Sequence, residues 1–164
     1  MRILLTILLA TAAHGQLLKD LKGNFDITKN NITKAAEKMT EEQYGYQPTP
    51  EVRTFGQLIG HVADAQYLFC SAAAVETVAP KGVEKGVKSK AGLVAAVKEA
   101  FAYCDKVYAG LNDEVALKSV KFFGSDRTKA GVLSFNNMHN YEHYGNIVTY
   151  MRIKGLVPPS SERQ

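Results

Sequence analysis

The residues that most constrain the architecture of this chain lie near its end and read Asn137-Met138-His139-Asn140-Tyr141-Glu142-His143-Tyr144-Gly145-Asn146. Two histidines stand four positions apart in this stretch, and side chains at that spacing share one face of a helix, about 5–6 Å apart. Two imidazoles in this arrangement can bind the same metal ion, as the helical histidine pairs of zinc enzymes do. Asn140 follows His139 where a metalloprotease would have glutamate, so the pattern argues against that class of peptidase.

A metal ion needs at least one more ligand, and the chain has four histidines in total. His14 falls in a segment that we expect to be removed, which leaves His61. This residue lies on the apolar face of an expected helix, where a histidine is more often a hydrogen-bonded core residue than a ligand. All three remaining histidines nevertheless lie on inward helix faces. We therefore predict one metal site formed by His61, His139 and His143.

Helical periodicity of apolar residues marks four long segments. They are expected to span residues 16–39, 54–76, 90–111 and 128–154. Suitable capping residues stand at several of the ends, namely Thr54, Ser89 and Gly155. The sequence therefore predicts an all-α fold made of a single four-helix bundle.

The connections between these segments have a different composition. Residues 78–88 contain proline, two glycines and three lysines, which is typical of an exposed loop. Residues 117–123 alternate as a short strand would, and residues 124–126 suggest a turn.

The first fifteen residues have the pattern of an export signal. Arg2 precedes the apolar run of residues 3–10, and Ala13-His14-Gly15 fits a small-x-small cleavage site. The run is too short to cross a bilayer, which takes about 20 residues. Its alternative role is to form buried first turns of the first helix. We expect residues 1–15 to be a cleaved signal peptide and residues 16–164 to be the mature domain, periplasmic or extracellular and without a membrane anchor.

Composition limits the partners of the chain. A length of 164 residues with 46% hydrophobic and 22% charged residues is typical of one globular domain. The net charge is +4, but the lysines are scattered and form no basic stripe. Nucleic-acid binding is therefore not expected.

Whether the two cysteines, Cys70 and Cys104, can form a disulfide depends on how the helices are arranged. If the second and third helices run parallel, both cysteines lie at similar heights, and an exported protein can join them in a disulfide. If those helices run antiparallel, the heights differ by about 12 Å, which is too far for a bridge. Buried, unpaired thiols are the other expectation.

Four segments resemble the DinB-like (DNA-damage-inducible) metal-dependent proteins, namely residues 44–48, 53–64, 139–147 and 150–159. The resemblance extends over about residues 17–160. It implies an up-down-down-up four-helix bundle that binds one zinc or nickel ion through His61, His139 and His143. Asn146 departs from the glutamine that many relatives have there. Related bundles often pair, so a homodimer is expected.

Three neutral histidines leave a coordination position for water or substrate, which is typical of a catalytic metal site. The resemblance and this ligand set favour a metal-dependent hydrolase that acts on an unknown small molecule. A thiol-dependent S-transferase or isomerase and a non-catalytic metal-binding stress-response protein are the alternatives.

No general base is identified from the sequence. The nearest carboxylates, Asp64 and Glu142, are more simply interpreted as surface charges than as proton acceptors. Three tyrosines near the expected site are more simply interpreted as core aromatics, namely Tyr67, Tyr144 and Tyr150.

Overall fold

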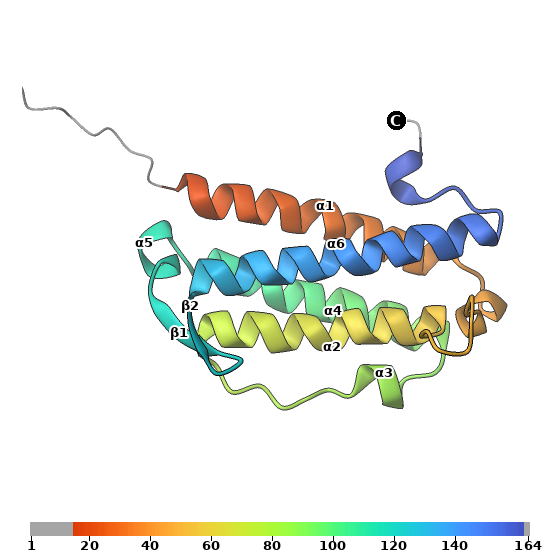
Figure 1. The fold of residues 1–164 in the computed structure, drawn as a ribbon, viewed down its shortest axis with the longest axis horizontal. Helices are drawn as coiled ribbons and strands as arrows, with labels where there is room; N and C mark the ends of the chain where they lie inside the picture. The colour runs from red at the N-terminus through yellow and green to blue at the C-terminus, as the bar shows by residue number, and fades with distance from the viewer. Residues whose placement is uncertain (1–14, 163–164) are drawn as a thin grey trace, which may run out of the picture.

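The computed structural model describes residues 15–162, so residues 1–14 of the predicted signal peptide, including His14, lie outside the described residues. Four long helices form the bundle, namely α1 (Gln16–Lys38), α2 (Phe55–Ala74), α4 (Lys90–Ala109) and α6 (Lys129–Ile153). Figure 1 shows that α1 and α6 run in one direction and that α2 and α4 run in the other. The predicted up-down-down-up four-helix bundle is confirmed.

Short elements connect the long helices: η1 (Glu42–Gly45), α3 (Val83–Gly86), α5 (Asp113–Ala116), β1 (Ser119–Phe122), β2 (Ser125–Thr128) and η2 (Pro159–Ser161). Because α2 and α4 are parallel, the chain between them must return along the whole length of α2 (Figure 1). Among the described residues, no helix combines the length and apolar character needed to cross a membrane.

The helix ends follow local sequence signals. Thr54 accepts a hydrogen bond from the backbone N–H of Gln57, whose side chain accepts one from the Thr54 N–H, which is a capping box. The Ser89 and Thr128 side chains cap α4 and α6 by accepting hydrogen bonds from the backbone N–H groups of Gly92 and Gly131, without a reciprocal bond. Gly155 has a φ of 72°, the left-handed conformation that glycine favours after a helix. The predicted caps at Thr54, Ser89 and Gly155 are confirmed.

The start of α1 depends instead on a distant residue. The Asp113 carboxylate, at the first residue of α5, accepts hydrogen bonds from the backbone N–H groups of Gly15, Leu17 and Leu18 at 2.9–3.1 Å. These N–H groups have no partners within their own helix. A side chain 95 to 98 residues away therefore caps α1, which local sequence does not reveal.

Residues 78–88, expected to be only an exposed loop, contain the helical turn α3. The Asp64 carboxylate accepts hydrogen bonds from the backbone N–H groups of Val83 at 2.9 Å and Glu84 at 3.0 Å. A Cβ atom on Gly60 would lie 2.6 Å from the Cα atom of Glu84, so only glycine lets the turn approach α2 this closely. The expectation was incomplete because contacts with α2 stabilise this turn.

The strand-like stretch forms a hairpin with β2. Ser119 pairs with Thr128 and Phe122 with Ser125 in antiparallel register. The two connecting residues, Phe123 and Gly124, have positive φ values of 47° and 76°. Ser125 therefore begins the second strand, and the turn lies one residue earlier than predicted.

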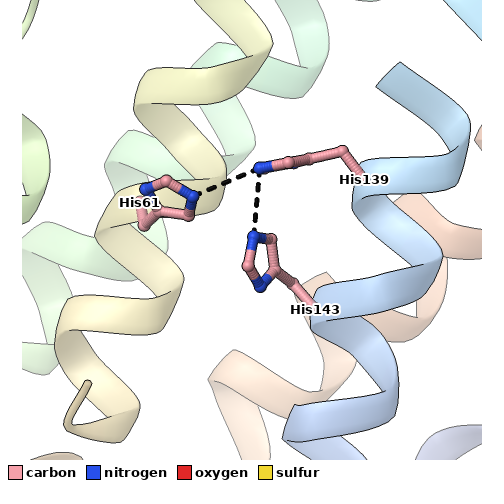
Figure 2. A group of neighbouring side chains, drawn as sticks. All are labelled: His61, His139 and His143. Atoms are coloured by element: carbon pink, nitrogen blue, oxygen red, sulfur yellow. Dashed lines mark hydrogen bonds between the residues drawn. The ribbon is translucent and has the colours of Figure 1, made fainter. Parts of the chain in front are cut away.

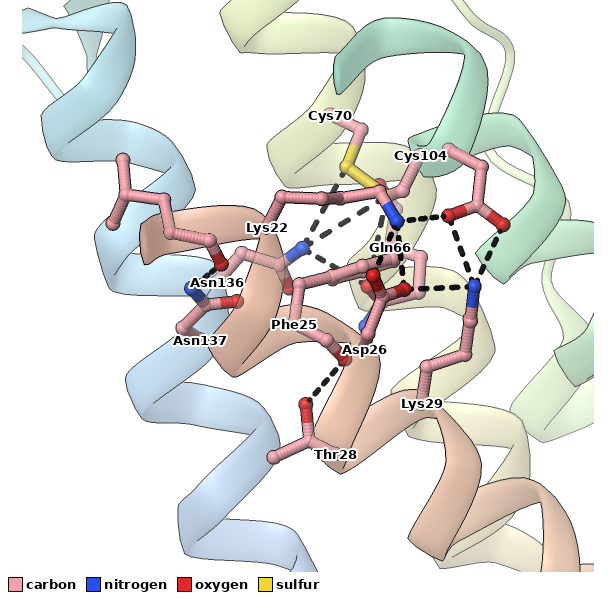
Figure 3. Close-up of polar contacts among 12 residues, drawn as sticks. Lys22, Phe25, Asp26, Thr28, Lys29, Gln66, Cys70, Cys104, Asn136 and Asn137 are labelled. Carbon is pink, nitrogen blue, oxygen red and sulfur yellow. Dashed lines mark hydrogen bonds and ion pairs between the residues drawn. A yellow bond between two sulfur atoms is a disulfide. The ribbon is translucent and has the colours of Figure 1, made fainter. Parts of the chain in front are cut away.

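Cys70 and Cys104 form a disulfide between α2 and α4, with their Cα atoms 5.4 Å apart (Figure 3). The two helices are parallel, so the cysteines lie at the same height. Of the two alternatives left open by the sequence, the structure has the disulfide, and its described part contains no free cysteine.

Candidate metal centre

Three histidines from two neighbouring helices converge on one point (Figure 2). The Nε2 atom of His139 lies 3.2 Å from that of His61 and 3.0 Å from that of His143. Each histidine offers a ring nitrogen that lies within 4.8 Å of those of the other two. The structure thus brings together the three residues predicted as ligands.

Hydrogen bonding alone does not satisfy this cluster. A neutral imidazole carries one N–H group, so Nε2 of His139 can donate to one neighbour or accept from one neighbour. It is close to two nitrogens of the same kind. A cation placed among the three atoms accepts a lone pair from each and removes the conflict.

The spacing also suits a metal ion. Zinc–nitrogen bonds are about 2.0–2.1 Å long, so nitrogens that share a tetrahedral ion lie about 3.4 Å apart. The two measured separations, 3.2 and 3.0 Å, need to open only slightly to reach that value. The residues present therefore fit a divalent metal with three histidine ligands.

Burial keeps these histidines neutral. Desolvation and then the neighbouring imidazoles lower the pKa of His139 to about 3, and the same two causes lower the pKa of His143 to about 4. Burial also lowers the pKa of His61. The lone pairs that a metal requires are therefore available at neutral pH.

The proton of His61 faces a carboxylate that the sequence reasoning missed. The Nδ1 atom of His61 lies 3.2 Å from Oε2 of Glu84, and Arg53 Nε donates to Oε1 of Glu84 at 2.8 Å. Burial alone would raise the pKa of Glu84, but Arg53 and His61 outweigh it and leave the pKa below its usual value. A carboxylate on the outer nitrogen of a histidine fixes the tautomer that presents Nε2 to a metal. Glu84 stands in the lysine-rich connection, and only α3 places it there.

The other two imidazoles have no such partner. Their Nδ1 atoms, in His139 and His143, are buried and accept or donate no hydrogen bond within the described part of the chain. With Nε2 facing inward, these Nδ1 atoms carry the protons. Within residues 15–162, Glu84 is therefore the single group that orients a histidine of the centre through its outer nitrogen.

Two residues considered as proton acceptors differ in their surroundings. Both carboxylate oxygens of Asp64 accept hydrogen bonds from the α3 backbone, so its role is structural although it lines the groove beside His61. Glu142 is exposed and lines a hollow together with His143. The sequence interpretation of both as surface charges is therefore wrong for Asp64.

All three tyrosines are buried in the core, as expected, and two of them also line a cavity. Tyr144 donates to Ser160 Oγ at 2.9 Å and packs in the core, as expected. Tyr150 donates to the Arg53 carbonyl at 2.8 Å and lines the hollow beside His143. Tyr67 lines a groove beside His61 and His139.

Two cavities flank the histidines. The groove beside His61 and His139 has a volume of about 630 Å³, and the hollow beside His143 has about 760 Å³. Glu84 lines both. Both volumes lie in the range of small-molecule sites.

The fold and these side chains define a class: a four-helix bundle in which histidines from two neighbouring helices form a candidate metal centre. The sequence model of the DinB superfamily matches residues 24–147. The chain belongs to the DinB superfamily. A search of curated proteins gave no match.

Several solved structures share the fold. A DinB-like protein from Bacillus cereus ATCC 10987 has a TM-score of 0.76 at 17% identity, over 86% of this chain and 95% of its own. The DinB-like protein YjoA from Bacillus subtilis has a TM-score of 0.69 at 19% identity, over 88% of this chain and 99% of its own. YfiT from Bacillus subtilis, described as a probable metal-dependent hydrolase with an unusual four-helix bundle topology, has a TM-score of 0.65 at 15% identity, over 85% of this chain and 88% of its own.

Proposed function

We propose that this protein binds one divalent metal ion, zinc or nickel, through His61, His139 and His143 and hydrolyses a small molecule. The observation that carries the proposal is the convergence of three neutral imidazoles beside two cavities. Three protein ligands leave a position for water or substrate, whereas a structural zinc site is usually closed by four. The likeness of the fold to that of YfiT, described as a probable metal-dependent hydrolase, also supports a hydrolytic metal centre.

Glu84, Arg53 and Glu142 each have a role in this proposal. A bound divalent metal supplies a water of lowered pKa and polarises a carbonyl group. Glu84 holds the proton on Nδ1 of His61, so that Nε2 keeps its lone pair. Arg53 holds Glu84 in place. Glu142, on the wall of the hollow beside His143, is the candidate acceptor for the proton that the attacking water loses.

Elemental analysis of purified protein tests the centre. We expect one zinc or nickel ion per chain in the wild type and close to none in His61→Ala. Met138→Ala is the matched control, because Met138 is 58% exposed on α6, one position before His139. A full metal content in His61→Ala would overturn the three-histidine centre. Hydrolysis of esters and amides by the metal-loaded protein, lost in the same variant, tests the activity.

We also propose that the protein is exported and forms a homodimer. The disulfide supports export, because cytosolic thiols are usually kept reduced. We expect a mature amino terminus at Gln16 and a species of two chains in sedimentation. An intact Met1 on protein from its own host, or a single-chain species, would contradict the respective part.

A further inference from the structure

The walls of the groove beside His61 and His139 are mainly aromatic and aliphatic, chiefly Tyr67, Leu68, Phe69, Val78, Phe123 and Phe135. Charged side chains also line it, namely Asp64, Lys81, Glu84 and Lys85. Leu68 is 49% exposed and Phe123 is 68% exposed, so apolar surface faces solvent directly beside a polar centre. A water molecule and a metal ion need far less than about 630 Å³. The groove therefore has room for a sizeable apolar group next to the site of reaction.

Phe123 is held at this groove in an unfavourable backbone conformation. Its φ of 47° lies in the left-handed region, where a bulky residue is an outlier and where hairpin turns prefer asparagine, aspartate or glycine. Its ring centroid lies 4.2 Å from that of Phe122 and 6.5 Å from that of Phe135. Such strain often accompanies a functional role. Here it places an aromatic ring on the groove wall.

The hollow on the other side of the centre has a different chemistry. Its charged side chains are Arg53, Glu51, Glu84 and Glu142. Arg53 is already paired with Glu84. One arginine against three glutamates leaves an excess of negative charge, which disfavours an anionic group and suits a neutral polar or cationic one.

The two cavities lie in sequence along α6. Phe135 and His139 line the groove, whereas His143 and Thr149 line the hollow. From Phe135 to Thr149 the helix rises about 21 Å at 1.5 Å per residue. One elongated molecule can therefore reach from the groove past the histidines into the hollow.

We infer that the substrate is an acyl amide or ester with an apolar acyl chain in the groove and a neutral or cationic amine or alcohol part in the hollow. The inference rests on the proposed hydrolytic function. The oxygen of water bonds to the carbonyl carbon, the bond from that carbon to nitrogen or oxygen breaks, and the leaving atom takes a proton. The products are a fatty acid and an amine or an alcohol.

Binding of alkyl hydroxamates to the zinc-loaded protein, measured by calorimetry, tests the groove without turnover. Each added methylene from acetohydroxamate to octanohydroxamate should tighten binding about threefold to fourfold. Leu68→Asp should weaken octanohydroxamate binding at least tenfold and leave acetohydroxamate binding unchanged. Ile27→Asp is the matched control, since Ile27 is 52% exposed on α1 and lines neither cavity, and it should change neither affinity.

A second variant covers the case in which Leu68→Asp does not fold. Glycine suits the positive φ of position 123, so Phe123→Gly should fold and should flatten the dependence on chain length. If acetohydroxamate binds and longer chains bind no better, the acyl-chain inference fails and the metal centre stands. If the protein holds no zinc or binds no hydroxamate, the proposed function fails and the inference fails with it.

The amine part is tested by comparing three octanoyl amides on the zinc-loaded protein. Octanoyl-ethanolamide and octanoyl-putrescine should be cleaved about two- to fivefold faster than octanoyl-glycine, the size expected for charges at the surface. Glu142→Lys should shift binding of the three compounds towards octanoyl-glycine by a similar factor. Preference for octanoyl-glycine in the wild type, or cleavage of none of the three, would overturn the assigned substrate class.

Discussion

Helix α2 is linked to its neighbours at two points with opposite properties. At Cys70 a disulfide joins it to Cys104 on α4, and both cysteines are fully buried. Nine residues earlier, about 13 Å along the helix, His61 meets His139 and His143 on α6, and its side chain is 26% exposed. The first link is covalent and closed, whereas the second is open to two cavities.

The surroundings of the two links explain the difference. Near the disulfide, the buried Gln66 side chain accepts a hydrogen bond from Asn136 at 2.9 Å (Figure 3). It also donates one to Asn140 at 2.7 Å. The Gln66 amide is paired there with both asparagines, while Asn136 Oδ1 and Asn140 Nδ2 have no hydrogen-bond partner among the described residues. At the histidines, lone pairs face one another and require a cation. The bundle is thus stabilised away from the centre, so the centre can remain accessible without loss of the fold.

The largest expected effect is on the metal content of the histidine centre. His139→Ala and His143→Ala should each reduce the metal content from one ion per chain to almost none, because two neutral imidazoles hold a divalent ion weakly. The helical circular dichroism should stay unchanged, since the core does not depend on the ion. Tyr141→Ala, an exposed position on the same helix, is the control. Loss of helical signal together with the metal would show that the two links are not independent.

Removing the disulfide should have the converse effect: it should lower stability and leave the metal content unchanged. Cys70→Ala combined with Cys104→Ala should lower the free energy of unfolding by about 2–4 kcal/mol, because the unfolded chain gains the freedom of the released loop. Denaturant titration measures this. Metal content in the double variant should equal that of the wild type. A large loss of metal in this variant would mean that the disulfide also positions the histidines.

A smaller effect is expected at Glu84, whose carboxylate contacts the outer nitrogen of His61. Glu84→Gln should weaken metal affinity about 10- to 100-fold, because the amide holds the proton of His61 less strongly. Competition with a chelator of known affinity gives the value. Lys88→Gln, in the same connection, should leave the affinity unchanged. Equal affinities for Glu84→Gln and the wild type would remove Glu84 from the centre.

The smallest effect concerns an ion-pair cluster between α1 and α4 (Figure 3), in which Lys22 and Lys29 also pair with Asp105, the residue after Cys104. Asp26 lies 2.6 Å from Lys22 and 2.9 Å from Lys29. Burial alone would raise its pKa, but the two lysines outweigh it and hold the pKa of Asp26 below 3.8. The stabilisation is therefore present above pH 3.8 and is lost as the pH falls through the lower folded-state pKa. At neutral pH, Asp26→Asn should cost less than about 1 kcal/mol, because the pairs are partly exposed to solvent.

Thermal melts of Asp26→Asn and wild type across pH test this last expectation. The two curves should converge in strong acid and separate above pH 4. A difference that persists unchanged at pH 2 would show that the variant acts through packing and not through charge.

Local patterns in the sequence determined much of the architecture. The apolar spacing gave four helices, and Thr54, Ser89 and Gly155 marked their ends within a few residues, because capping depends on atoms close in the chain. The spacing of His139 and His143 placed both on one helix face for the same reason. The choice of His61 as their partner required the additional expectation that inward faces meet.

Only the tertiary structure decided the remaining features. The cysteines join because α2 and α4 run parallel, which neither helix specifies alone. Glu84 reaches His61 because Gly60 lets α3 approach and Asp64 caps that turn from α2. These contacts join residues from different helices. Their formation depends on which surfaces pack together, and the free energy of that packing is absent from any local stretch of sequence.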